Sequence, residues 1–340
     1  MLVLTAQEVK RFLDMRSCID AVETAFRTRG LGGRATSAVA GVALTDGKLH
    51  AKLATLDGDR PYAVTKINAN IPGNPSRRGL PSIQGVVVLF DAVTGTPLAV
   101  MDSGVITAMR TAAASAVAAR WLALENAYTL AVIGCGIQAR AHLEALLQVR
   151  PIRRLRAYDI DPDAAAAFCS AMHSAHGLDC ASSPTVHEAT VGSAIIVTTT
   201  PSREPIVNVD DVDPGTFIAA VGADSEDKQE LSVDLFRSGV IVVDDIEQCA
   251  RIGDLHHAIQ AGAMTISDVR ASLDEIVSRR VAGRHADSEV IIFDSTGVAI
   301  EDAAAAAIVY EKAEAAGVES AVDSAGSAGV ESAVDSAGSH

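Results

Sequence analysis

A short run of glycines between an apolar segment and a helix-forming segment constrains this chain of 340 residues more than any other feature. The segment YTLAVIGCGIQARAHLEAL contains the pattern G-x-G-x-x-A at Gly134, Gly136 and Ala139. Gly134 allows a tight turn, Gly136 lets backbone N–H groups approach a pyrophosphate, and Ala139 keeps the helix close to the strand. Because a strand is predicted before the pattern and a helix after it, we predict a dinucleotide-binding loop, with Gln138 among its cofactor contacts. The alternative is a strand–turn–helix with a structural role only.

The cofactor that we predict for this loop is NAD. A second strand, Leu155 to Asp159, ends in an acidic residue about 20 residues after the loop, as dinucleotide-binding folds require. The Asp159 carboxylate would accept hydrogen bonds from the ribose hydroxyls and repel a 2′-phosphate, which favours NAD over NADP. Asp161 is a weaker candidate, because it lies beyond the predicted strand. Thr199, at the end of a later strand, is assigned to the same cofactor site.

Apolar segments alternate with helix-forming segments between residues 125 and 299. Buried strands that are separated by helices form parallel sheets covered on both faces. This part of the chain is therefore predicted to be an α/β Rossmann domain. Its strands are expected at 128–133, 153–159, 193–199, 216–221, 240–244 and 289–294.

The first 100 residues predict a helix followed by a mixed, mostly antiparallel sheet. Residues 83–91 and 96–101 flank the sequence AVTG, which is a hairpin signal with Gly95 at the turn.

The strands of this sheet gather basic side chains. Polar and apolar residues alternate from Leu49 to Leu53, so His50 and Lys52 share one face of a strand. The same alternation puts Lys66 beside asparagines on one face of the strand at 63–70.

The order of these segments predicts a Rossmann domain inserted in a split α+β domain. An Ala-rich helix at 106–124 precedes the predicted Rossmann domain, and a last helix near 301–316 returns to the first domain. We predict a substrate-binding and dimerisation domain at 1–124 plus 300–317, and an NAD-binding domain at 125–299. The sequence AGVESAVDSAGS occurs at 316–327 and again at 328–339, so residues 318–340 are predicted to be a disordered tail.

Charge and composition exclude several classes of partner. The formal net charge of −15 argues against nucleic acid and against an anionic membrane surface as partners. The five cysteines show no C-x-x-C pairing, which indicates reduced thiols in a cytoplasmic protein. Neither a signal peptide nor an apolar run long enough for a membrane span is expected. No metal is predicted, because adjacent residues such as His256 and His257 point in different directions on a helix.

Several longer stretches resemble one known family. They are KINANIPGNPSRRGLPSIQGVVVLFD (66–91), ITAMRTAAASAVAARWLA (106–123), VIGCGIQARAH (132–142), VGADSEDKQEL (221–231) and FDSTGVAIEDAAAAAIVYEKA (293–313). In this order and at these separations they resemble the ornithine cyclodeaminase and mu-crystallin family over nearly all of residues 1–317. The family includes cyclodeaminases of ornithine and lysine, an archaeal type of alanine dehydrogenase, and reductases of ketimines or imino acids. The resemblance implies an inserted Rossmann domain and a homodimer.

The resemblance also implies roles for individual residues. Lys66 matches the family lysine near the substrate carboxylate and reacting carbon, and Arg110 matches the arginine that binds the α-carboxylate. Thr111 would contact the cofactor phosphates. Asp224 matches the catalytic acid/base, and Arg34 matches a second carboxylate-binding arginine in a less diagnostic stretch.

The residues themselves give these roles partial support. Arg110 is predicted near the start of its helix, where a cation opposes the helix dipole unless it faces an anion. Asp224 follows a strand of the predicted parallel sheet, at the edge where such folds bind ligands. The alternatives are a solvent-exposed arginine, a solvated strand face around Lys66, a Lys52 that points to solvent, and a helix-capping role for Asp224.

The resemblance implies hydride transfer between NAD(H) and a substrate α-carbon that bears nitrogen. Cyclodeaminases hold a distal amine, whereas His50 and Lys52 would repel one. We therefore expect reduction of an α-imino acid to the L-amino acid, with iminosuccinate to aspartate as one candidate. The alternatives are an ornithine cyclodeaminase, which forms proline and ammonia, and a non-catalytic ligand-binding protein similar to mu-crystallin.

Overall fold

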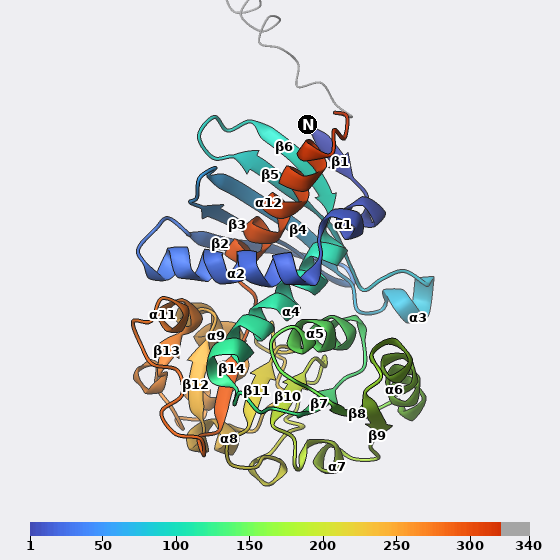
Figure 1. Cartoon of the computed structure of the whole chain (residues 1–340), viewed down its shortest axis with the longest axis vertical. Coiled ribbons are helices and arrows are strands. Elements are labelled where there is room, and N and C mark those ends of the chain that lie inside the picture. Colours follow the sequence, from blue (N-terminus) through green and yellow to red (C-terminus); the bar gives the residue numbers. More distant parts are fainter. Residues whose placement is uncertain (321–340) are drawn as a thin grey trace, which may run out of the picture.

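The computed structural model describes residues 1–320, which form two β-sheets stacked along the longest axis of the molecule (Figure 1). The amino-terminal strands build a six-stranded sheet, and later strands build an eight-stranded sheet. This arrangement confirms the predicted α/β fold with a Rossmann-type parallel sheet beside a second, mixed sheet. The bounds of the predicted domains stay a prediction.

The six-stranded sheet is mixed and mostly antiparallel, as predicted. Its strands, in sheet order, are β1 (Leu2–Leu4), β6 (Pro97–Asp102), β5 (Ile83–Asp91), β4 (Tyr62–Asn70), β3 (Gly47–Leu56) and β2 (Ser37–Leu44). Only β1 and β6 run parallel among the neighbouring pairs in this sheet of the described chain. The turn between β5 and β6 uses Gly95 at a φ of +73°, a conformation that favours glycine. The sequence does not predict β2, because SAVAGVAL lacks an alternating pattern.

The eight-stranded sheet is parallel throughout, which confirms the second fold prediction. Its strands, in sheet order, are β13 (Ala271–Ser272), β12 (Val240–Val243), β14 (Ile291–Asp294), β11 (Phe217–Ala220), β10 (Ile195–Thr198), β7 (Thr129–Ile133), β8 (Arg154–Tyr158) and β9 (Asp179–Ser182). The predicted strands agree with these bounds to within two residues. Strands β9 and β13 are not predicted, because they are short and carry no apolar run.

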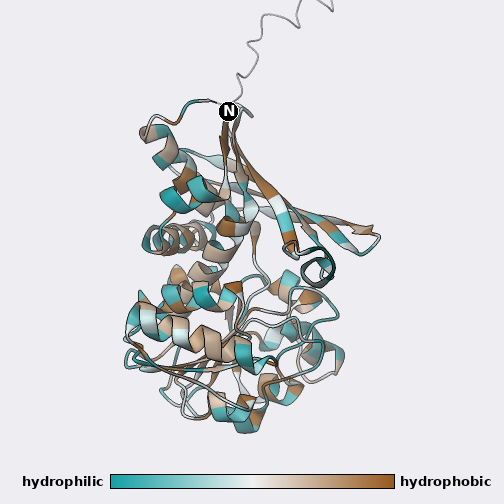
Figure 2. Ribbon diagram, turned by 90° about the vertical axis from the view of Figure 1, so that its right-hand side faces the viewer, coloured by the Kyte–Doolittle hydropathy of each residue, from teal (hydrophilic) through white to brown (hydrophobic). Residues whose placement is uncertain are grey.

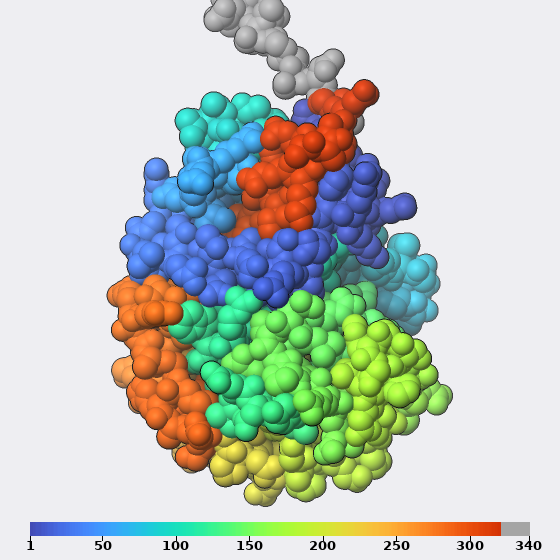
Figure 3. Space-filling model, in the orientation of Figure 1, coloured from blue at the N-terminus to red at the C-terminus, as the bar shows by residue number. Residues whose placement is uncertain are grey.

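Helices join and cover the two sheets. In chain order they are α1 (Ala6–Phe12), α2 (Met15–Gly30), α3 (Asn74–Arg78), α4 (Ser103–Leu122), α5 (Ile137–Leu147), α6 (Pro162–His176), α7 (Val186–Thr190), α8 (Val233–Ser238), α9 (Ile246–Ile252), α10 (Asp254–Gln260), α11 (Leu273–Val277) and α12 (Ala299–Ala315). Helix α2 crosses the molecule between its two halves (Figures 1 and 3). Short 3-10 turns lie at Val209–Asp211 and Ile266–Asp268.

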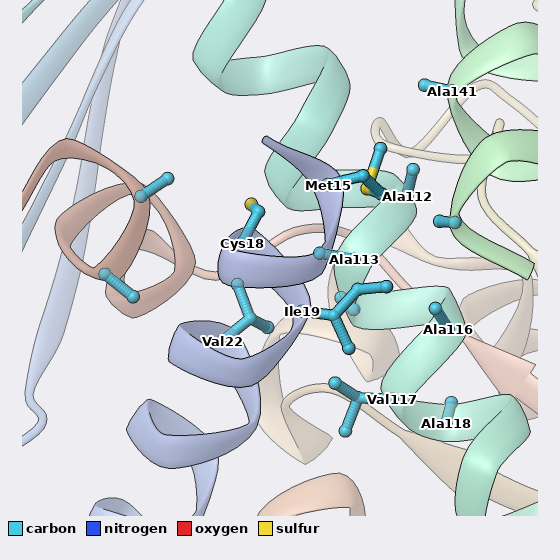
Figure 4. Close-up of a cluster of buried hydrophobic side chains, with 14 of the residues drawn as sticks. Met15, Cys18, Ile19, Val22, Ala112, Ala113, Ala116, Val117, Ala118 and Ala141 are labelled. Atoms are coloured by element: carbon cyan, nitrogen blue, oxygen red, sulfur yellow. The ribbon is translucent and has the colours of Figure 1, made fainter. Parts of the chain in front are cut away.

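The core between the two halves depends on small residues of α4. Ile19 of α2 points toward Ala113 and Val117 of α4, and all three side chains are fully buried (Figure 4). Alanines let the two helices approach closely, and burial of a side chain the size of Ile19 contributes roughly 1.5–3 kcal/mol. This packing positions α4, which carries Arg110 and Thr111, against both sheets.

Helix α12 brings the chain back to the six-stranded sheet. It follows β14 of the eight-stranded sheet and packs on β3, β4, α2 and α4. The predicted helix at 301–316 agrees with its bounds to within two residues. Most of the tail predicted to be disordered, residues 321–340, lies outside the described residues.

One face of the six-stranded sheet has little cover. In Figure 2 the helices of this half lie to one side of the sheet, apart from the short α3. Apolar side chains on its strands are exposed, including Val42 at 62%. Separately, none of the helices in residues 1–320 is both long and apolar enough to cross a membrane.

Candidate functional site

The glycine loop lies between β7 and α5, and it buries Gly134 while Gly136 is exposed. Gly134 has a φ of +91°, and a Cβ there would lie 3.0 Å from the Thr199 carbonyl oxygen. Gly136 is the N-cap of α5, where no side-chain hydrogen bond caps this helix within the described chain. A Cβ at Gly136 would meet open space. Ala139 is fully buried. The first N–H groups of α5 are therefore available to an anion.

A pocket of about 390 Å³ opens beside this loop at the carboxyl ends of β7, β8 and β10. It is lined by Gly134, Cys135, Gly136, Tyr158, Asp159, Ile160, Thr199, Thr200, Pro201, Ser202 and Ile206. The structure thus brings together Gly134, Gly136, Asp159 and Thr199 from the predicted cofactor site. Gln138 and Ala139 lie in α5 outside this lining, and the buried Gln138 Oε1 has no hydrogen-bond partner within residues 1–320.

Asp159 follows the last residue of β8 and is already engaged by backbone groups. Its Oδ2 accepts the Cys135 N–H at 2.7 Å, and its Oδ1 accepts the Asp161 N–H at 3.0 Å. These bonds hold the carboxylate at the edge of the pocket. Asp161 instead accepts the Asp163 N–H and caps α6, so its side chain has a structural role.

Three basic side chains are buried together beneath the six-stranded sheet. Lys52 of β3 lies directly opposite Lys66 of β4 in the antiparallel register. Lys66 is 1% exposed, Arg110 of α4 is 5% exposed and Lys52 is 9% exposed. We call Lys52, Lys66 and Arg110 the cation cluster. Burial of such charges requires anionic partners.

Two acidic residues of α12, Glu301 and Asp302, are the anionic partners of Lys66 and Arg110. Lys66 Nζ lies 2.8 Å from Asp302 Oδ1. Arg110 donates to Glu301 Oε2 at 2.7 Å, and its Nε lies 3.0 Å from Asp302 Oδ1. Both acids are fully buried. Sequence reasoning missed them, although two adjacent acids at the start of an Ala-rich buried helix are a signal that a cationic partner is needed.

Lys52 is held by backbone oxygens. Its Nζ donates to the carbonyls of Thr296 at 3.2 Å and Gly297 at 2.6 Å. Gly297 has a φ of +77°, and a Cβ there would lie 2.5 Å from a guanidinium nitrogen of Arg110. The loop between β14 and α12 is therefore part of the cluster. Sequence reasoning gave no role to this loop.

Burial and mutual repulsion shift the titration of the cluster. Burial, followed by the charge of Arg110, lowers the pKa of Lys66 to about 7. The same two causes lower the pKa of Lys52. Burial raises the pKa of Glu301, while the neighbouring Arg110 opposes that rise. Glu301 and Asp302 thus pair directly with Lys66 and Arg110, whereas Lys52 has no carboxylate within ion-pair distance among the described residues.

Asp224 and His50 lie at the margin of the cation cluster. Asp224 lies in the loop that follows β11, its side chain is 47% exposed, and it accepts a 2.6 Å hydrogen bond from Lys228. Its charge opposes the lowering of the pKa of His50, which burial and then Lys52 cause. Asp224 also opposes the lowering of the pKa of Lys52, so its charge acts on both basic groups. It is not the N-cap of the next helix, α8, which Ser232 caps.

Two predicted site residues have other partners. Arg34 is 84% exposed and its Nε lies 3.5 Å from Asp57 Oδ1, so the structure does not bring it into the cation cluster. Thr111 is buried in α4, where its hydroxyl donates to the Thr107 carbonyl at 2.7 Å. That hydroxyl is engaged within its own helix.

The predicted position of Arg110 near a helix start is wrong. Helix α4 begins at Ser103, so Arg110 lies about two turns inside it. The helix dipole acts mainly within the first and last turn. The helix dipole therefore has little effect on Arg110, and Glu301 and Asp302 balance its positive charge.

Comparisons with known proteins agree on one family. The model of the ornithine cyclodeaminase/mu-crystallin family matches residues 1–317. An archaeal alanine dehydrogenase dimer, solved with bound NAD, has a TM-score of 0.89 and 40% identity, covering 94% of this chain and 98% of its own. The Thermococcus litoralis Δ1-pyrroline-2-carboxylate reductase, solved with NADH and L-proline, has a TM-score of 0.91 and 34% identity, with coverage of 95% and 100%. The iminosuccinate reductase of Paracoccus denitrificans, solved with NAD+, has a TM-score of 0.85 and 30% identity, with coverage of 94% and 98%.

Proposed function

Because the chain belongs to the ornithine cyclodeaminase/mu-crystallin family, we propose that it is an NAD(H)-dependent oxidoreductase that reduces a small α-imino acid to the L-amino acid. The observation that carries this proposal is the cation cluster, in which Glu301 and Asp302 pair with Lys66 and Arg110 while Lys52 is held by backbone carbonyls. A single α-carboxylate would add an anion beside these three cations. The three solved relatives are named for reactions of an amino or imino acid, and each holds NAD or NADH.

The residues of the nucleotide pocket fit NAD. Gly136 leaves open space at the start of α5, where N–H groups can bind a pyrophosphate. Asp159 presents its carboxylate at the pocket edge for the ribose hydroxyls. Thr199 lines the same pocket. When bound, NAD(H) supplies or accepts the hydride at C4 of its nicotinamide.

The remaining chemistry is assigned to the cation cluster and to Asp224. We assign the α-carboxylate of the substrate to Lys66 and Arg110, which fix its orientation. Asp224 is assigned the proton transfer to or from the substrate nitrogen, because its carboxylate is accessible to solvent and its charge acts on Lys52 and His50.

A substrate with one carboxylate fits the charges best. Lys52 donates two hydrogen bonds to the Thr296 and Gly297 carbonyls. Burial lowers the pKa of His50, which favours its neutral form. Iminopropionate, which yields alanine, is therefore the first candidate. Iminosuccinate is the second candidate, because Lys52 has a third N–H and lies opposite Lys66. Ornithine fits less well, because its distal ammonium would meet these basic groups.

We further propose that the protein acts as a cytoplasmic homodimer. The uncovered face of the six-stranded sheet, with exposed side chains such as Val42 and Val86, supplies an apolar surface for a second copy. All five cysteines are unpaired, which is typical of a reducing compartment.

NADH oxidation at 340 nm tests the proposed reaction directly. Purified protein is given NADH and ammonia with pyruvate, with oxaloacetate, or with cyclic Δ1-pyrroline-2-carboxylate without ammonia. We expect turnover with pyruvate or oxaloacetate only when ammonia is present, and Asp224→Asn should abolish it. Turnover of ornithine to proline, with no net NADH consumption, would instead support a cyclodeaminase. Tight NADH binding without any turnover would support a binding protein.

A further inference from the structure

One buried carboxylate lies between the strand ends that carry the proposed cofactor contact and the proposed acid/base. Glu230 is 0% exposed and lies between β11 and α8. Its Oε2 accepts hydrogen bonds from Thr198 Oγ1 at 2.6 Å and from the Gly222 N–H at 2.7 Å. Its Oε1 accepts the Thr200 N–H at 2.5 Å. A single side chain therefore joins the carboxyl ends of β10 and β11.

Each of these strand ends leads into the proposed site. Thr199 lies between two of the residues that contact Glu230, and both Thr199 and Thr200 line the nucleotide pocket. Asp224 lies two residues after Gly222. The distance between the cofactor pocket and the acid/base therefore depends on how these two strand ends are held together.

The two backbones are close enough to exclude any side chain at Gly222. A Cβ on Gly222 would lie 2.2 Å from the Thr200 carbonyl oxygen and 2.4 Å from the Glu230 carboxyl carbon. The glycine thus lets the strand ends approach, and the carboxylate satisfies the donors that this approach buries.

Glu230 is itself fixed from the opposite side. Its backbone N–H donates to Asp254 Oδ1 at 2.8 Å, and the Asp254 N–H donates to Asp294 Oδ1 at 3.3 Å. Asp294 ends β14, and the loop that follows carries the carbonyls that bind Lys52. A continuous chain of hydrogen bonds and backbone thus connects the nucleotide pocket with the cation cluster.

Resting on the proposed reductase function, we propose that Glu230 is a positioning residue that sets the spacing between the cofactor pocket and Asp224. A carboxylate suits this position because both of its oxygens accept hydrogen bonds. Burial raises the pKa of Glu230, and the hydrogen bonds from the three donors oppose that rise. A glutamine has one oxygen and one NH2 group, so at least one of the three donors would lose its acceptor.

The test compares Glu230→Gln with the matched control Asp211→Asn. Asp211 is also a buried carboxylate, 8% exposed, that accepts the Asn208 N–H at 2.8 Å in the 3-10 turn Val209–Asp211, before β11. Four quantities are measured for each variant: Tm, the Kd of NADH by fluorescence, kcat, and KM for the imino acid at saturating NADH. For Glu230→Gln we expect NADH to bind more weakly and kcat to fall, so that the ratio of kcat to the Kd of NADH drops by about 10- to 100-fold. The KM for the imino acid should stay within about twofold. For Asp211→Asn we expect Tm to fall while Kd and kcat stay within about twofold.

The proposal is overturned if Glu230→Gln lowers Tm like the control but leaves the NADH Kd and kcat unchanged. If that variant does not fold, Thr198→Val removes one donor to the carboxylate and should still lower kcat several-fold without changing KM. An unchanged kcat in Thr198→Val would then reject the proposal. If the wild-type protein reduces no imino acid, the proposed function is contradicted. The NADH Kd of Glu230→Gln would still test the positioning role.

Discussion

The nucleotide pocket and the cation cluster use different means to prepare a binding site. The pocket presents backbone groups from a glycine loop and a single acid, Asp159, which lie within about 30 residues of one another, and the segment 199–206 completes its lining. The cation cluster presents buried side chains, and its ion pairs join residues far apart in the sequence. Lys66 pairs with Asp302 across 236 residues, and Arg110 pairs with Glu301 across 191 residues.

This difference decides how each site should respond to substitution. A backbone site loses little when one side chain changes, since the N–H groups remain in place. A buried ionic site loses much, because removal of one partner leaves the other charge unpaired in a dry environment. Changes in the cation cluster should therefore cost more than changes in the nucleotide pocket.

The largest effect is expected from Asp302→Asn. Asp302 lies within ion-pair distance of both Lys66 and Arg110, so its loss leaves two cations facing Glu301 alone. We expect the free energy of unfolding in urea to fall by roughly 3–5 kcal/mol. Asp57→Asn, which breaks the pair with the exposed Arg34, should change it by less than about 1 kcal/mol. Equal losses in the two variants would contradict the contrast between buried and exposed pairs.

A smaller effect is expected from Lys52→Ala. Lys52 holds the Thr296 and Gly297 carbonyls, so its loss should loosen the loop beside Arg110. We expect kcat/KM to fall by about tenfold to a hundredfold, equally for iminopropionate and iminosuccinate. Lys48→Ala, on the same strand, should have little effect. A loss confined to iminosuccinate would instead show that Lys52 binds a second carboxylate.

The pH dependence of kcat/KM sharpens the comparison further. The pKa of Lys66 is lowered to about 7, so Lys66 is cationic below that pH and neutral above it. Because the cation binds the substrate carboxylate, kcat/KM should fall as pH rises through about 7, by about tenfold per pH unit at most. Lys66→Arg should remove this fall, since arginine stays protonated. A fall of the same shape in Lys66→Arg would assign the titration to another group.

The nucleotide pocket should tolerate substitution best. Asp159→Ser combined with Ile160→Arg should improve the use of NADPH relative to NADH, because a 2′-phosphate then meets a cation and no carboxylate. Ile160 is 92% exposed at the pocket edge, so the new side chain has room. Ratios of kcat/KM for the two cofactors measure the change. A wild-type preference for NADPH would contradict the role of Asp159.

The same contrast explains what the sequence could predict. The glycine loop, the strand ends of the parallel sheet and the position of Asp159 follow from patterns within short segments, and the structure reproduces their geometry. Lys66 and Arg110 were singled out by resemblance. Glu301, Asp302 and the loop at Gly297 were missed, because their roles arise from contacts with residues far away in the sequence.

The position of a residue within a helix or loop was also harder to predict than the presence of that helix or loop. Arg34 lies in a loop before β2 and is exposed, which no local pattern indicates. The start of α4 at Ser103 depends on Asp102, whose side chain accepts the Gly104 and Val105 N–H groups. A helix predicted to begin three residues later placed Arg110 wrongly near its start.

The most direct measurement determines kcat/KM for the imino acid and the Kd of NADH in one preparation of Arg110→Lys. Lysine keeps a positive charge beside Glu301 and Asp302, but it lacks the planar pair of donors that binds a carboxylate. We predict that kcat/KM falls by about tenfold to a hundredfold while the Kd of NADH stays within about twofold. An unchanged kcat/KM, or an equal weakening of both quantities, would contradict the assignment of substrate to the cation cluster and of cofactor to the glycine loop.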